Sequence, residues 1–105
     1  MRTISLNGKD FILKYTLRAF FVFENMTGYP FQFGKIIDEY LLFYSFLLAN
    51  NPDSFNMEFD AFIEACENDL TLFNQFKEFI LEEIKLRSQG VGNDVKKKKV
   101  TKRKR

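Results

Sequence analysis

Carboxylates are the only side chains in this sequence that are frequent enough to suggest catalysis. Asp and Glu together occur 14 times, whereas His, the commonest general base and metal ligand, does not occur. Asp38-Glu39 and Glu82-Glu83 are chain neighbours, but adjacent helix positions point about 100° apart, so these pairs do not converge. Glu64 and Glu67 share a helix face, which we interpret as a solvated face. We therefore predict that the protein is not an enzyme.

The single cysteine, Cys66, offers little further chemistry. It can form no disulfide within the chain, and one thiol fits a reducing compartment. Because it lies at helical spacing with Phe59, Phe62 and Ile63, we interpret it as a small core residue. Glycine-rich phosphate loops are also missing from the sequence. We expect neither a metal nor a cofactor.

The most conspicuous local feature is a basic segment in which eight Lys and Arg accompany one acid. Residues 91–105 carry a net charge of +7, whereas residues 1–90 carry 8 Lys and Arg against 13 Asp and Glu, a net charge of −5. The segment could bind nucleic acid through its phosphates, act as a nuclear-import signal, or serve neither purpose, as a solubilising end or a by-product of coding. It lacks the aromatic residues needed for base stacking. The candidate nucleic-acid-binding residues are Lys96, Lys97, Lys98, Lys99, Lys102, Arg103, Lys104 and Arg105.

The charge contrast also predicts the domain organisation. With 105 residues, the chain has room for one domain and one modest core. Phe occurs 14 times and Trp never, so phenylalanine should dominate that core. From residue 90 onward the only apolar residues are three valines, too few to offset the entropy of ordering. We predict a helical domain over residues 1–89 and a disordered basic tail over residues 90–105.

An N-terminal β-hairpin should precede the helices. Asn7-Gly8 favours a type I′ turn, and the flanking segments, residues 3–6 and 9–15, alternate apolar and polar side chains. A lone hairpin is only marginally stable, so one of its faces should pack on the helices.

Helical periodicity and capping residues predict four helices after the hairpin. They are Leu17 to Thr27 with Thr16 as N-cap and Gly28 as stop, Lys35 to Ala49, Met57 to Glu67 with Asn56 as cap, and Leu70 to Arg87 with Asp69 as cap. We expect a mainly α fold, a small bundle of about four helices with the N-terminal hairpin.

Two of these helices have more apolar surface than one small core requires. The helix over residues 17–27 is apolar almost all round, which predicts burial on several sides. The helix over residues 35–49 should turn a stripe including Ile36 and Ile37 inward, which leaves Leu42 and Phe46 on its polar side. This surplus suggests an interface for self-association or for another protein. The candidate protein-binding residues are Phe20, Phe23, Leu42 and Phe46.

The sequence resembles the small tail assembly chaperones of long-tailed bacteriophages over roughly residues 1–88. The resemblance lies in the hairpin followed by a helix that ends Phe23-Glu24-Asn25-Met26-Thr27-Gly28. It continues in the run Leu41-Leu42-Phe43-Tyr44 and in the Phe-rich segment from Phe59 to Cys66. The charge of the basic tail departs from this family, whose function does not need it.

The resemblance implies a chaperone that binds the tape-measure protein and keeps it soluble while tail-tube subunits polymerise around it. It also implies self-association, a cytoplasmic location in an infected bacterial host, and departure from the finished virion. Members are often made in a second, longer form by ribosomal frameshifting, for which a run of adenines encoding residues 96–99 would be a slippery site. The alternatives are a nucleic-acid-associated protein with a basic arm and a structural virion subunit.

No membrane contact is expected. The first six residues lack the apolar run of a signal peptide, and the longest apolar-rich stretch, residues 40–49, is far shorter than the roughly 20 residues that cross a bilayer. We expect a soluble, intracellular protein.

Overall fold

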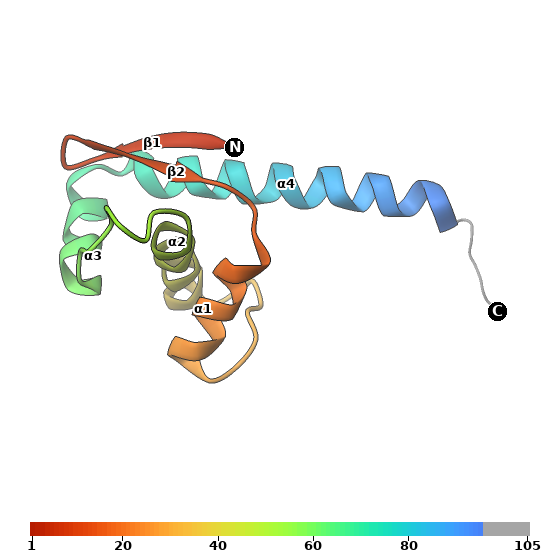
Figure 1. The fold of residues 1–105 in the computed structure, drawn as a ribbon, viewed down its shortest axis with the longest axis horizontal. Coiled ribbons are helices and arrows are strands. Elements are labelled where there is room, and N and C mark those ends of the chain that lie inside the picture. Colours follow the sequence, from red (N-terminus) through yellow and green to blue (C-terminus); the bar gives the residue numbers. More distant parts are fainter. Residues whose placement is uncertain (96–105) are drawn as a thin grey trace.

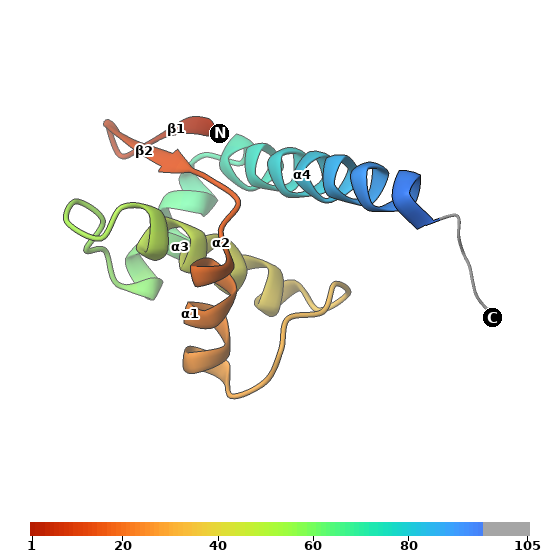
Figure 2. The ribbon, with the colours of Figure 1, turned by 45° about the vertical axis from the view of Figure 1, so that its right-hand side comes forward.

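The computed structural model describes residues 1–95, and the side chains of residues 1–88. A two-stranded antiparallel sheet precedes the four helices of this part of the chain, as the sequence predicts (Figure 1). The elements are β1 (Arg2–Leu6), β2 (Lys9–Leu13), α1 (Leu17–Thr27), α2 (Ile36–Asn50), α3 (Phe59–Asn68) and α4 (Thr71–Val95). Helix α2 lies in the middle, with α1, α3, α4 and β2 packed against it (Figures 1 and 2). The fold is mainly α with an N-terminal hairpin.

The hairpin forms where its turn residues predict. Asn7 and Gly8 have φ angles of 54° and 82°, the left-handed conformations that a type I′ turn requires. Ile4 pairs with Phe11, and both side chains face the helices together with Leu6 and Leu13. The hairpin therefore contributes one complete apolar face to the core.

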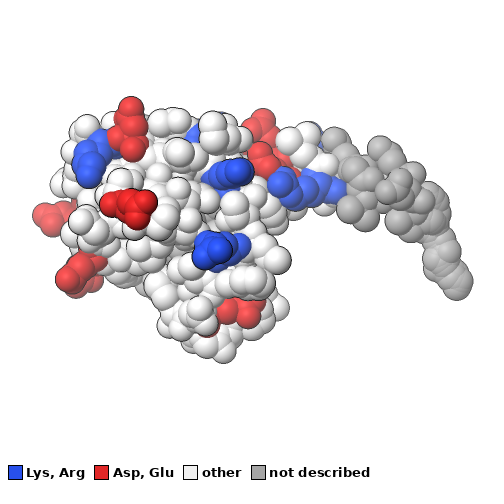
Figure 3. Space-filling model, viewed as in Figure 1, with Lys and Arg blue, Asp and Glu red and all other residues white. Residues whose placement is uncertain are grey.

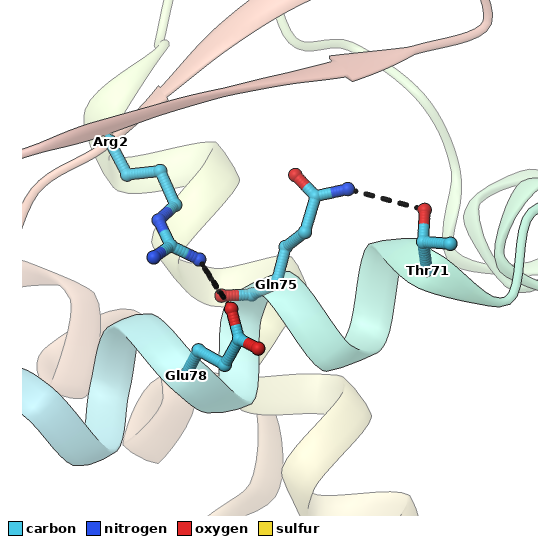
Figure 4. Close-up of polar contacts among 4 residues, drawn as sticks. All are labelled: Arg2, Thr71, Gln75 and Glu78. Atoms are coloured by element: carbon cyan, nitrogen blue, oxygen red, sulfur yellow. Dashed lines mark hydrogen bonds and ion pairs between the residues drawn. The ribbon is translucent and has the colours of Figure 1, made fainter.

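Two polar side chains hold the hairpin to the helices. Arg2 of β1 donates hydrogen bonds from Nη1 to the Gln75 carbonyl (2.8 Å) and to Glu78 Oε1 (3.3 Å) on α4 (Figure 4). Buried Asn51, just after α2, accepts a bond from Ile12 N–H (2.9 Å) and donates one to the Ile12 carbonyl (3.0 Å). The Asn51 amide thus pairs with β2 as a neighbouring strand would.

Helix α1 has the predicted caps but not the predicted burial. Thr16 Oγ1 accepts a bond from Ala19 N–H (3.3 Å), and Gly28 ends the helix at φ 85°. Only Ala19 and Phe23 are buried. Burial on several sides is wrong, because α1 lies at the edge of the molecule and packs mainly on α2 (Figure 2).

Helix α2 has the predicted length but a different inward face. Leu42 and Phe46, which the sequence pattern places on its polar side, are buried together with Asp38 and Ser45, whereas Ile36 and Ile37 are exposed. Neighbours surround the middle and the end of α2, so both sides of the helix are covered there. Its first turn extends past them and leaves two isoleucines uncovered.

Helix α3 starts two residues later than predicted, and Asn56 is not its cap. The Tyr44 hydroxyl donates a bond to the Met57 carbonyl (2.6 Å), and the first helical bond runs from Phe62 N–H to the Glu58 carbonyl (2.9 Å). The hydrogen bond from Tyr44 therefore holds residue 57 outside the helix. Asp69 does cap α4, since its Oδ1 accepts bonds from the N–H and the hydroxyl of Thr71.

Helix α4 is longer than predicted, because it continues from Arg87 to Val95. Each glycine costs a helix only about 1 kcal/mol relative to alanine, and extending an existing helix is far easier than starting one. Residues 90–95, which the sequence analysis assigns to the disordered tail, continue the helix in the structure, while residues 96–105 lie outside the described residues. Leu86 is exposed, and the C-terminal part of α4 extends beyond the other elements (Figure 1).

Candidate protein-binding surfaces

Three of the four predicted protein-binding residues belong to the core, and the fourth, Phe20, is half-buried against it. Phe23, Leu42 and Phe46 have no exposed surface, and the Phe20 ring packs edge-to-face on Phe46 at 5.5 Å between centroids. Helix α1 crosses α2 at this point and covers the side of α2 that lacked a predicted neighbour. Phe23, Leu42 and Phe46 therefore stabilise the fold and, contrary to the prediction, offer no surface to a partner, whereas Phe20 keeps part of its surface exposed.

The exposed apolar side chains lie elsewhere, and one set covers the outer face of α1. Leu17, Phe21 and Met26 are 68%, 55% and 42% exposed. A shallow hollow of ≈ 430 Å³ opens beside Phe21 and is lined also by Arg18, Val22 and Asn25. This surface has the size and shape to receive apolar side chains of another molecule, but it forms no deep groove.

A second set forms a groove between α2 and α3, which we call the α2–α3 groove. It has a volume of ≈ 300 Å³. Its lining is apolar except for one carboxylate and consists of Ile36, Ile37, Tyr40, Ile63, Cys66, Glu67 and Leu70. Ile36 and Leu70 are 70% and 77% exposed, so this chain leaves them uncovered. The groove has the more apolar lining of the two surfaces.

Packed aromatic rings support the α2–α3 groove from below. The Tyr40 ring stacks on Phe73 of α4 at 4.1 Å, nearly parallel, and Lys77 Nζ lies 5.4 Å from the Phe73 ring centre. Burial raises the pKa of the Tyr40 hydroxyl and, with a smaller contribution from Asp69, raises the pKa of the Cys66 thiol to about 11. Cys66 is therefore a protonated, unreactive thiol at neutral pH, as its interpretation as a core residue requires.

Acidic side chains run along α3 beside the groove. Asp60, Glu64 and Glu67, which we call the acidic stripe, are spaced by four and three residues and so share one face of α3, and all three are exposed. Residues 36–76 contain eight Asp and Glu and no Lys or Arg. Figure 3 shows acidic side chains over the end of the molecule where α3 lies. The surface next to the groove is consequently strongly negative.

A third hollow, of ≈ 450 Å³, lies in the loop before α2 and is more polar. The Tyr29 hydroxyl donates a 2.8 Å bond to the buried Asp38 carboxylate, and this bond, with smaller effects of burial and of the Asp38 charge, raises the Tyr29 pKa. Lys35 Nζ lies 5.5 Å from the Tyr29 ring centre. The Tyr29 hydroxyl and the Asp38 carboxylate thus satisfy each other within this region, so we interpret the hollow as structural.

The described residues offer no other candidate site. Within residues 1–95 no cluster of three or more His, Cys, Asp or Glu could hold a metal ion, and none of their helices is long and apolar enough to cross a membrane. The eight candidate nucleic-acid-binding residues of the tail lie outside the described residues.

Comparison with known proteins leaves the family open. No protein-family model, no curated protein and no solved structure matches this chain. The surfaces described above therefore carry the functional argument.

Sequence reasoning missed the α2–α3 groove because it assigned Ile36 and Ile37 to the core. One signal could have found it. Ile36 and Ile37 stand at the very start of their helix, and Leu70 follows Asp69 between two helices, so all three are apolar residues at helix ends. Apolar residues at the ends of helices are the ones that packing neighbours most easily fail to cover.

Proposed function

We propose that this protein is a tail assembly chaperone of a long-tailed bacteriophage, which binds the tape-measure protein in the cytoplasm of the infected host. The observation that supports this best is the apolar surface left uncovered on a small, complete fold. Its core is closed by the hairpin and four helices, yet Leu17 and Phe21 on α1, and Ile36 and Leu70 at the α2–α3 groove, stay exposed. Exposed apolar patches of this kind are typical of protein interaction sites.

The mechanism follows from the chemistry of those surfaces. A long helical client exposes apolar stripes until its partners assemble, and such stripes aggregate. The chaperone would cover them with its own uncovered apolar side chains while its charged surface keeps the complex soluble. The negative charge of residues 1–90 would favour clients with basic stretches and repel acidic ones.

Binding to a tape-measure fragment tests the proposal. A soluble fragment with predicted amphipathic helices should co-purify with the chaperone and bind it at micromolar concentration in calorimetry. A chaperone variant with Leu17→Lys and Phe21→Lys, two exposed positions on α1, should bind less tightly if that surface contributes. If the wild-type chain stays free at micromolar concentrations of the fragment, the chaperone proposal fails.

Self-association is part of the same proposal, and contact with tail-tube protein would follow during assembly. The exposed apolar face of α1 gives two copies a surface to share. Sedimentation velocity over a range of concentrations should show a species heavier than one chain. A single monomeric boundary up to about 100 μM would rule out a homo-oligomer tighter than that concentration.

The charge separation along the chain favours a second candidate function, binding of nucleic acid through the basic tail. Eight cations would give a salt-dependent, sequence-independent attraction to phosphates. An electrophoretic mobility shift with and without residues 91–105, at two salt concentrations, tests it. Absence of a shift at low salt eliminates this candidate, and mass spectrometry of purified particles would detect the third candidate, a structural virion subunit.

A further inference from the structure

The α2–α3 groove has a shape and a charge that together specify its ligand. We propose that this groove binds an amphipathic α-helix, whose apolar side chains enter the groove and whose Lys or Arg side chains lie along the acidic stripe. The inference rests on the proposed function in taking this helix to be a segment of the client protein. It adds the binding site and the chemistry that the client must have.

The apolar lining gives the energy of binding. Ile36 and Leu70 are among the most exposed apolar side chains of the described residues, while Cys66 and the stacked Tyr40 ring form a rigid floor. A side chain that enters the groove would remove both from water without repacking the core. Burial of such surface is the main favourable term in protein association.

The arrangement of the lining favours a helix over an extended strand as the ligand. On α3 the lining residues Ile63, Cys66 and Glu67 follow the spacing i, i+3 and i+4 on one helix face, and Leu70 follows just beyond the end of the helix. Side chains of two helices form the walls, so the groove offers no free backbone edge to which a strand could pair. Helix-in-groove recognition uses apolar anchors at this same spacing on the ligand.

Charge decides which amphipathic helix fits. Like charges four residues apart on one helix face repel each other, and Asp60 and Glu64 have this spacing. The ion pairs among residues 1–88 use Glu39, Glu78 and Glu83, and none of them involves the acidic stripe. Glu67 belongs both to the stripe and to the groove lining, so a cation flanking the apolar face of the ligand would lie directly against it.

The face of α1 fits such a ligand less well. Its hollow contains a cation, Arg18, and no carboxylate among its lining residues. A basic helix would meet repulsion there and attraction at the α2–α3 groove. The two apolar surfaces therefore differ in the charge of the ligand they accept, which an experiment can detect.

Three synthetic peptides test the proposal on the full-length protein. The first is an 18-residue helical peptide with Leu at i, i+3, i+4 and i+7 and Lys at the flanking positions. The second replaces each Lys by Glu, and the third has the composition of the first with its Leu residues distributed around the helix. In fluorescence anisotropy, the first peptide should bind, and each of the other two should bind at least about tenfold more weakly. Equal affinity of all three would overturn the proposal.

Matched variants locate the site. Ile36→Asp and Leu70→Asp change exposed positions of the groove, and Leu17→Asp changes an equally exposed position on α1. The two groove variants should weaken binding of the first peptide by about tenfold or more, and Leu17→Asp by less than about threefold. Circular dichroism should show unchanged thermal unfolding in all three. If Leu17→Asp weakens binding as much as the groove variants, the groove is not the site.

Charge reversal tests the acidic stripe separately. The double variant Glu64→Lys with Glu67→Lys should weaken binding of the Lys peptide by about tenfold and strengthen binding of the Glu peptide. The control, Glu24→Lys with Glu82→Lys, changes the net charge equally at exposed positions of α1 and α4. If both double variants have the same effect, only the overall charge matters and the stripe has no specific role.

The same variants separate this inference from the proposed function. If a tape-measure fragment binds the wild-type and groove variants equally, the groove proposal fails while the chaperone proposal stands. If the Lys peptide binds in the groove but the fragment does not bind at all, the ligand chemistry holds and the client is a different protein. If the peptide does not bind and Leu70→Asp abolishes self-association, a second copy of this chain occupies the groove, which overturns the proposal.

Discussion

Helices α1 and α2 are both rich in apolar residues but have very different surroundings. Both contain Phe residues, yet α1 buries only Ala19 and Phe23, whereas α2 buries six residues that include Asp38 and Ser45. Helix α2 has neighbours on several sides, and α1 has essentially one. The apolar content of a helix therefore indicates how much apolar surface it could bury. How much it does bury depends on the elements packed against it. The apolar surface that stays exposed on α1 and on the first turn of α2 is available to a partner.

The largest expected difference between the two helices concerns their phenylalanines. Phe46→Ala on α2 should lower the free energy of unfolding by about 3–5 kcal/mol, because Phe46 is fully buried among Phe20, Phe76 and Phe79. Phe21→Ala on α1 should change it by less than about 0.5 kcal/mol. Urea denaturation followed by circular dichroism measures both. Similar losses in the two variants would mean that α1 is covered on both faces.

The next largest effect on stability concerns Asn51, the residue that follows α2. Asn51→Leu should lower the free energy of unfolding by about 1–3 kcal/mol, because it leaves the N–H and the carbonyl of Ile12 without their partner. Asn50→Ala is the matched control, since Asn50 donates a single exposed bond to the Lys14 carbonyl. The same denaturation experiment applies, and a cost for Asn50→Ala equal to that for Asn51→Leu would contradict the special role of Asn51.

A smaller, pH-dependent effect is expected at Glu39 on α2. Burial raises its pKa, but the Gly34 N–H and the Lys77 ammonium outweigh this and hold the pKa below its usual value. A carboxylate with a depressed folded-state pKa stabilises the fold above its unfolded pKa of about 4.3 and loses that contribution as the pH falls through the folded pKa.

Glu39→Gln should therefore cost less than about 1 kcal/mol at pH 7, and the difference from the wild type should vanish below the folded-state pKa of Glu39. Glu24→Gln, at an exposed position of α1, is the control and should cost nothing measurable at either pH. Denaturation at pH 7 and pH 3 tests both variants, and a pH-independent cost at Glu39 would exclude the ionic contribution.

The smallest effect on stability is expected on the outer face of α1. Leu17→Lys should change the free energy of unfolding by less than about 0.5 kcal/mol, because Leu17 is 68% exposed. It should nevertheless reduce self-association in sedimentation velocity if α1 provides the shared surface. Unchanged association would assign that surface to a different part of the molecule.

Local features of the fold could be predicted from the sequence. The Asn7-Gly8 turn, the Thr16 cap and the Gly28 stop each depend on the conformation of one or two residues, and all three form as predicted. Cys66 follows the same logic, since its place on the apolar face of α3 can be inferred from spacing alone. These signals need no knowledge of distant parts of the chain.

The inward face of α2 and the candidate groove could not be predicted in this way. Whether Ile36 or Leu42 is buried depends on where α1 and α3 pack against α2. The periodicity of apolar residues within each helix does not predict this. The acidic stripe was visible in part as Glu64 and Glu67 on one face, but its position beside an apolar groove depends on the packing of α3 against α2. The end of α4 was misjudged because glycine weakens a helix without ending it.

The Asn51 amide has a consequence for aggregation. In an antiparallel pair of strands, the backbone N–H and carbonyl groups of alternate residues point towards the partner strand or away from it. Those of Ile12 in β2 point away from β1. An open strand edge of this kind is a template on which another chain can add a strand. Asn51 fills that position within the same molecule. Its loss would leave an edge with exposed backbone groups next to Phe11 and Leu13, in a chain whose task would be to keep another protein soluble.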